Sequence, residues 1–111
     1  MPVASNNYQA DRVLYATATA RLVAPPVNVA QASVVIAPAN VDRVGWVIYN
    51  NGANSVYIVL GSTATSVLCA KILATFATWE CYGPAVYTGA LSAIRNAGSG
   101  AVNVYELIRT A

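Results

Sequence analysis

The segment from residue 43 to residue 61 constrains the fold more than any other part of the chain. It contains two runs rich in β-branched and aromatic residues, at about 44–50 and 55–60, with Asn51-Gly52 between them. Such residues favour β-strands, and an Asn-Gly pair tolerates the positive φ angles of a tight turn. The sequence therefore predicts a β-hairpin over this segment.

Both faces of this predicted hairpin are apolar. Successive side chains of a strand point to opposite faces, and the face away from Trp46 carries four residues that are themselves apolar or aromatic: Val47, Tyr49, Tyr57 and Val59. A sheet with one solvated face would carry polar residues at every second position. We therefore predict that these four residues form an interface, either with another copy of the chain or with a larger assembly.

The low content of charged residues also indicates association. Of the 111 residues, 57% are hydrophobic and only 9% are charged, whereas a typical soluble domain carries about 25% charged residues. A monomer so poor in charge would expose large apolar patches, which soluble monomers rarely do. A homo-oligomer or a larger assembly is therefore favoured over the alternative, a soluble monomer with a surface of Ser, Thr, Asn and Ala.

Neither a nucleic acid nor a membrane is expected as a partner. The basic residues are scattered, at Arg12, Arg21, Arg43, Lys71, Arg95 and Arg109, whereas nucleic-acid-binding proteins concentrate them on one patch. The longest charge-free run, 44–70, is broken by the polar segment 50–55, and a spanning helix needs about 20 predominantly apolar residues. The N-terminal segment lacks the basic and apolar regions of a signal peptide.

Catalysis is not expected, and we predict no catalytic residues. The chain has no histidine, and its only acidic residues are Asp11, Asp42, Glu80 and Glu106. The Ser-His-Asp and Cys-His arrangements of nucleophilic enzymes are therefore excluded. Glu80 and Glu106 could form the carboxylate pair of a glycosidase, but surface or sheet-edge charges are the simpler interpretation of each.

No cofactor or metal site is predicted either. Cys69 and Cys81 do not have the spacing of a metal or redox motif, and no histidine is present to complete a zinc site. They could form a disulfide if neighbouring strands bring them together, but two buried thiols are favoured. Gly98-Ser99-Gly100 lacks the lysine and the spacing of a phosphate-binding loop, and it predicts a hairpin turn.

Short β-rich runs separated by turn-forming residues extend along the chain. Candidate strands cover residues 17–23, 27–36, 44–50, 55–60, 76–80, 85–88, 91–95 and 101–108, and residues 67–73 could form a strand or a helix. Turn signals at intervals of about 8–12 residues are typical of an all-β sandwich or barrel. We predict an all-β fold, a single antiparallel β-sandwich or jelly-roll-like barrel over residues 17–111, preceded by an extended N-terminal arm over residues 1–16.

Four stretches carry a resemblance to a known group of proteins: Asn-Val-Asp-Arg-Val-Gly-Trp-Val-Ile-Tyr-Asn-Asn-Gly at 40–52, Ser-Val-Tyr-Ile-Val-Leu-Gly at 55–61, Tyr-Thr-Gly-Ala-Leu-Ser-Ala-Ile at 87–94 and Gly-Ser-Gly-Ala-Val-Asn-Val-Tyr-Glu at 98–106. Together they resemble small β-rich virion proteins of tailed bacteriophages, of the capsid decoration (cement) type. The resemblance implies a non-enzymatic protein that binds the outside of an assembled shell and stabilises contacts between neighbouring capsid subunits. It further implies the major capsid protein or other virion subunits as partners, a preference for a homotrimer, and a location in the virion after assembly in the host cytoplasm.

Two other functions are consistent with the same sequence. One is a tail or fibre adaptor of the virion. The other is a carbohydrate-binding β-sandwich that uses exposed Trp and Tyr side chains. Trp46 is in phase with Val44 and Ile48 and is expected in the core, so Trp79 and Tyr82 are the candidates for sugar contact.

Overall fold

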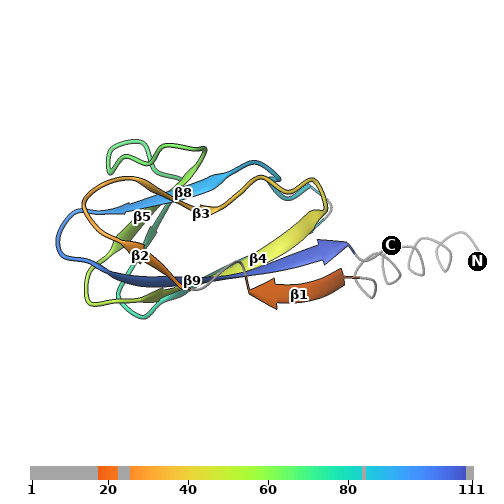
Figure 1. Cartoon of the computed structure of the whole chain (residues 1–111), viewed down its shortest axis with the longest axis horizontal. Helices are drawn as coiled ribbons and strands as arrows, with labels where there is room; N and C mark the ends of the chain where they lie inside the picture. Colours follow the sequence, from red (N-terminus) through yellow and green to blue (C-terminus); the bar gives the residue numbers. More distant parts are fainter. Residues whose placement is uncertain (1–17, 23–25, 84, 110–111) are drawn as a thin grey trace, which may run out of the picture.

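A computed structural model describes residues 18–22, 26–83 and 85–109 of the chain (Figure 1). In these ranges every regular element is a β-strand: β1 (Ala18–Leu22), β2 (Val27–Val29), β3 (Val34–Ala37), β4 (Arg43–Asn51), β5 (Val56–Leu60), β6 (Lys71–Leu73), β7 (Thr78–Tyr82), β8 (Leu91–Arg95) and β9 (Gly100–Arg109). The all-β prediction is therefore confirmed. The arm predicted over residues 1–16 lies outside the described residues.

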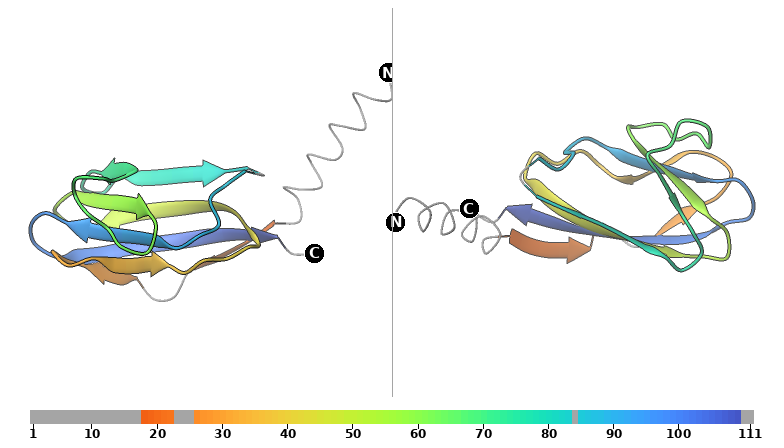
Figure 2. Two further views of the ribbon diagram at one scale, coloured as in Figure 1. Left: turned by 90° about the horizontal axis from the view of Figure 1, so that it is seen from above. Right: turned by 180° about the vertical axis from the view of Figure 1, so that it is seen from behind.

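The strands form two antiparallel sheets that pack against each other as two layers (Figures 1 and 2). One sheet has the order β1-β9-β4-β7, and β2 also pairs with β9. The other has the order β3-β8-β5-β6. The result is the sandwich-like arrangement that the short, evenly spaced strands predicted.

The core lies between the two sheets and consists of the inward-facing side chains of both. Its buried members include Ile36, Trp46, Ile48, Val56, Ile58, Leu73, Leu91, Val102 and Val104. Trp46 and Trp79 meet edge to face, with ring centroids 5.1 Å apart and planes at 72°, an arrangement that aromatic pairs favour. The assignment of Trp46 to the core is confirmed.

The predicted hairpin at Asn51-Gly52 is wrong, because β4 and β5 belong to different sheets. The positive φ angles among the described residues belong to Phe76, Gly83 and Gly98, so Gly52 does not adopt the conformation of a tight hairpin turn. A Cβ atom on Gly52 would lie 2.5 Å from Nη2 of Arg95. Gly52 therefore provides room for a buried guanidinium where the chain crosses from one sheet to the other.

Other segments also differ from the predicted strands and turns. Gly98 has a φ of 69°, but the segment 96–99 connects β8 and β9 of different sheets and does not form a hairpin. The run 27–36 is divided between β2 and β3, again in different sheets, and residues 85–88 are not a strand. Of the run 67–73, only residues 71–73 are in a strand.

Candidate interaction surface

The structure places the four predicted interface residues on opposite sides of the molecule. Val47 and Tyr49 lie on the outer face of the five-stranded sheet, and Tyr57 and Val59 lie on the outer face of the four-stranded sheet. All four side chains are half-buried. They therefore do not form one surface, and each pair has to be considered with its own neighbours.

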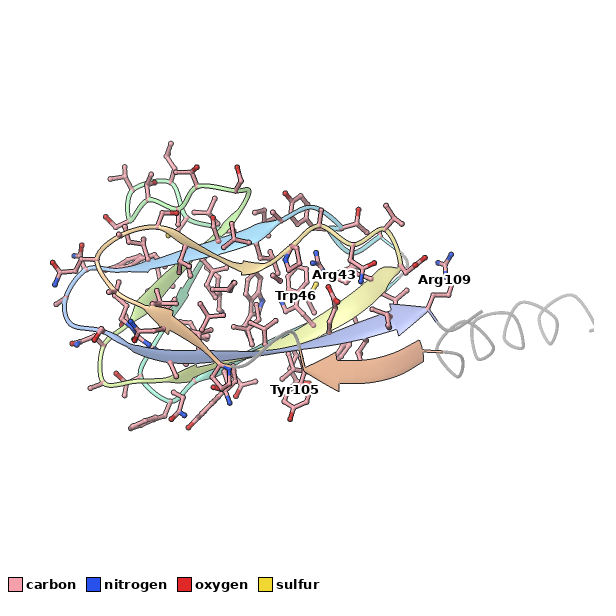
Figure 3. All side chains as sticks on the ribbon, viewed as in Figure 1. Arg43, Trp46, Tyr105 and Arg109 are labelled. Atoms are coloured by element: carbon pink, nitrogen blue, oxygen red, sulfur yellow. The ribbon has the colours of Figure 1, made fainter. Side chains whose placement is uncertain are left out.

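The outer face of the five-stranded sheet gathers aromatic and aliphatic side chains across three strands. Val47 lies between Glu80 on β7 and Tyr105 on β9, and Tyr49 lies between Thr78 and Asn103. Tyr105 is 47% exposed, and its side chain points away from the sandwich (Figure 3). Cross-strand neighbours of this kind pack directly against one another, so these side chains form one continuous surface.

Gly45 extends this surface toward one end of β4. Its register partners on the two sides are Tyr82 and Leu107. A Cβ atom on Gly45 would lie 2.9 Å from Cδ1 of Tyr82 and 3.2 Å from Cδ1 of Leu107. The absence of a side chain at Gly45 therefore lets both neighbours lie over the strand. We call the set Val47, Tyr49, Tyr82, Tyr105 and Leu107 the outer patch.

Glu80 is the charged residue beside the outer patch. The hydroxyl of Tyr82 donates a hydrogen bond to Oε1 of Glu80. This hydrogen bond, with smaller contributions from desolvation and from the charge of the carboxylate, raises the pKa of Tyr82 above its ordinary value. Tyr82 and Glu80 are both exposed on the last strand of the sheet, so the pair is accessible from the edge of the sheet as well as from its face.

The outer face of the four-stranded sheet is different, because the chain covers part of it. Ser92 lies between Val35 and Val59 on that face, yet it is fully buried. The loop between β5 and β6 lies on this side of the sheet (Figure 1), where the backbone N–H of Ala64 donates to Oγ of Ser33 over 2.7 Å. Part of the second cover predicted for the β5 residues therefore comes from the protein itself.

Sequence reasoning missed four large exposed apolar side chains in the described connections, and the most exposed of them is Val41, between β3 and β4, at 86%. Val67 is 84% exposed and Leu68 79%, both in the loop between β5 and β6. Phe76 is exposed between β6 and β7 and has a φ of 58°, which is unusual for a bulky residue. The apolar run 67–73 predicted a regular element. Val67 and Leu68 are exposed because the strand begins only at Lys71, and both residues lie in the loop before it.

Two buried charged clusters hold the fold together. Nε of Arg43 is 2.8 Å from Oε2 of Glu106, and its two Nη atoms donate to the carbonyls of Tyr87, Gly89 and Pro38. Both side chains lie between the sheets, as Figure 3 shows for Arg43. Glu106 and Glu80 therefore lie on opposite faces of the same sheet, and they cannot act together on one glycosidic bond.

Arg95 forms the second cluster and has no acidic neighbour among the described residues. Nε donates to the Val29 carbonyl over 2.8 Å, Nη2 to Oδ1 of Asn50 over 2.9 Å and to the Ala101 carbonyl over 3.2 Å, and Nη1 to the Asn54 carbonyl. Burial lowers the pKa of Arg95, but a guanidinium still keeps its charge at neutral pH. These contacts span both sheets, so the cluster is structural.

The remaining candidates from the sequence are the two cysteines, a metal site, a membrane span and Trp79. Cys69 and Cys81 are free thiols and are half-buried. Within the described ranges, no group of three potential metal ligands comes together, and no helix there is long and apolar enough to cross a membrane. Trp79 packs against Trp46 and the core, so it does not form an exposed platform.

Comparison with known proteins adds no relative: no family model, curated protein or solved structure matches this chain.

Proposed function

We propose that this chain is a non-enzymatic structural protein of a virion, a capsid decoration protein that binds an assembled shell through its outer patch. The observation that carries the proposal is the patch itself, in which three tyrosines, a valine and a leucine share one face of a sheet with Thr78, Asn103 and a single carboxylate, Glu80. Interfaces of stable assemblies are enriched in aromatic residues and depleted of charge at their centre. The resemblance to phage virion proteins supplies the shell as the partner.

Burial of apolar and tyrosine surface would dominate this attachment. Each Å² of apolar surface removed from water contributes roughly 25 cal/mol, and a stable interface buries about 800 Å² on each partner. Raising the salt concentration from 0.1 to 1 M shortens the screening length from about 10 to 3 Å, which weakens ionic contacts but not apolar ones. We therefore expect the protein to stay on its particle over that range.

The experiment is co-sedimentation with particles from the source lysate, with heads and tails separated. The test variant is Tyr105→Ser, which removes an exposed ring from the outer patch. The matched control is Val67→Ser, which removes an exposed apolar side chain from the loop on the opposite side. We expect binding to heads, weakened at least tenfold by Tyr105→Ser and unchanged by Val67→Ser.

Other outcomes point elsewhere. Release by moderate salt, or a larger effect of Val67→Ser, would contradict attachment through the outer patch. Association with tails alone would favour the adaptor function. Binding of glycans that is lost in Tyr82→Ser would favour the carbohydrate-binding function. Tyr82 is the exposed candidate for sugar contact, because Trp46 and Trp79 pack together against the core.

The proposal includes a homo-oligomer, because a chain so poor in charge is expected to bury surface permanently. The resemblance implies a trimer, since decoration proteins often occupy three-fold positions.

The proposal also includes the arm over residues 1–16 as a segment that becomes ordered against a neighbour. Deleting residues 1–16 should weaken particle binding and leave the thermal transition unchanged, and a large loss of stability would instead assign the arm to the core.

A further inference from the structure

The outward edge of β7 carries unused hydrogen-bonding groups. Of the described strands, only β4 pairs with β7. At the two ends of this ladder, Asn50 N–H donates to the Ala77 carbonyl and Gly83 N–H donates to the Val44 carbonyl. Backbone groups of an antiparallel strand alternate in direction, so Trp79 and Cys81 direct theirs toward β4. Thr78, Glu80 and Tyr82 direct theirs away from the sheet.

The other edges are less suited to pairing. β2 and β6 have three residues each, and the register of β3 shifts between Val35 and Ala37. β1 is followed directly by residues outside the described ranges. β7 is a regular five-residue strand, and an edge of this kind readily accepts another strand.

We propose that β7 pairs antiparallel with β7 of a second copy of this chain, in the register that places Cys81 opposite Cys81 of the other copy. This contact deepens the homo-oligomer in the proposed function and rests on the association that the function includes, but not on which particle component is bound. It joins two five-stranded sheets into one continuous sheet. The outer patches of the two copies then lie side by side on the same face.

The side chains of β7 favour this register over the one centred on Glu80. A contact centred on Glu80 would place two carboxylates directly opposite each other, and like charges at opposed positions destabilise a sheet. Moving the centre to Cys81 places each Glu80 opposite Tyr82 of the other copy. Tyr82 already donates a hydrogen bond to Glu80 within the strand. The same two groups can therefore form a hydrogen bond across the interface, once at each of the two equivalent positions.

The symmetry gives the proposal a definite mass. Antiparallel pairing of two identical strands is two-fold, so it produces a dimer, whereas a trimer needs a head-to-tail contact between different surfaces. The mass of the full chain therefore separates this contact from the trimer that the resemblance implies.

The first test measures mass by light scattering over a concentration series, for the full chain and for Glu80→Pro. The N–H of Glu80 points out of the sheet, so proline removes no hydrogen bond within the molecule and is tolerated at such an edge. Because the contact is two-fold, the substitution removes one interface hydrogen bond at each of two equivalent positions. We therefore expect the dimer to weaken at least tenfold. Glu80→Gln keeps the N–H and an acceptor for Tyr82, and it should remain a dimer.

The second test reads the register and does not require the proline variant to fold. In Cys69→Ser protein, mild oxidation should link two chains through Cys81, because directly opposed residues at a non-hydrogen-bonded position have Cα atoms about 4.5 Å apart. In a register centred on Glu80 the two cysteines are diagonal, at about 7–8 Å, which is beyond disulfide reach. Cys81→Ser protein with Cys69 intact is the control and should not cross-link at this contact.

The outcomes are decisive. A dimer that cross-links through Cys81 and is weakened by Glu80→Pro supports the proposal. A monomer, a trimer, or a dimer that neither cross-links through Cys81 nor responds to Glu80→Pro overturns it. Particle binding, measured with Tyr105→Ser, tests the proposed function separately, so the failure of one can be told from the failure of the other.

Discussion

Arg95 on β8 donates a hydrogen bond from Nη2 to Oδ1 of Asn50 on β4 over 2.9 Å, and this contact joins the two sheets at their buried faces. Asn50 in turn donates from Nδ2 to the carbonyls of Asn54, Leu73 and Ala74. The two polar side chains together satisfy backbone carbonyls of four separate segments, at Val29, Asn54, residues 73–74 and Ala101. Since buried polar groups without partners are costly, this network fixes how the chain crosses between the sheets.

Replacing Arg95 should be strongly destabilising even when the charge is kept. We expect Arg95→Lys to lower the free energy of unfolding by about 3 kcal/mol. A single ammonium cannot reach all of the acceptors that the planar guanidinium binds, and some of them are left unsatisfied. Urea denaturation measures the loss. Arg109→Lys, at an exposed position, is the control and should stay within about 0.5 kcal/mol of the unchanged protein.

Gly52 should tolerate no side chain, although its φ is not positive. Gly52→Ala places a Cβ atom 2.5 Å from Nη2 of Arg95, and displacing the guanidinium should cost about 1–3 kcal/mol. The matched control is Gly61→Ala, whose nearest contact would be Cγ1 of Val59 at 3.6 Å. It should be neutral or slightly stabilising. Equal melting temperatures for the two variants would contradict the role assigned to Gly52.

Breaking the buried ion pair should cost more than neutralising an exposed carboxylate. Glu106→Gln keeps the shape of the side chain but leaves Arg43 buried without its opposite charge, and we expect a loss of about 3–5 kcal/mol. Glu80→Gln makes the same chemical change at an exposed position and should alter stability by less than about 0.5 kcal/mol. Thermal or urea unfolding of both variants at neutral pH gives the comparison.

The pKa of Tyr82 should fall when Glu80 loses its charge. The hydrogen bond to Glu80 raises the pKa of Tyr82 above 10.0. The contribution of this hydrogen bond to stability is therefore present below about pH 10 and is lost as the pH rises through the pKa of Tyr82 in the folded protein. Absorbance titration of the phenolate measures this, with Tyr82→Phe protein identifying the signal. An unchanged titration in Glu80→Gln would show that the carboxylate does not hold the phenol proton.

Local pattern was enough to predict several of the strands and their core faces, since alternation acts over a few residues. The placement of Trp46 in the core and the strands near 44–50, 55–60 and 91–95 follow from that alternation. The outward direction of Val47 and Tyr49 follows from it as well.

Only the tertiary structure decided which strands pair. β4 pairs with β9, some 50 residues later in the chain, rather than with β5 beyond Asn51-Gly52. A short connection that contains Asn-Gly suits either a hairpin or a crossing between sheets. The crossing is chosen by buried polar groups that no local pattern reveals. Arg43, Arg95 and Glu106 read as ordinary surface charges in the sequence, yet each is buried among acceptors or donors from distant segments. Those partners exist only after folding, which is why charge in the sequence could not show where charge would be buried.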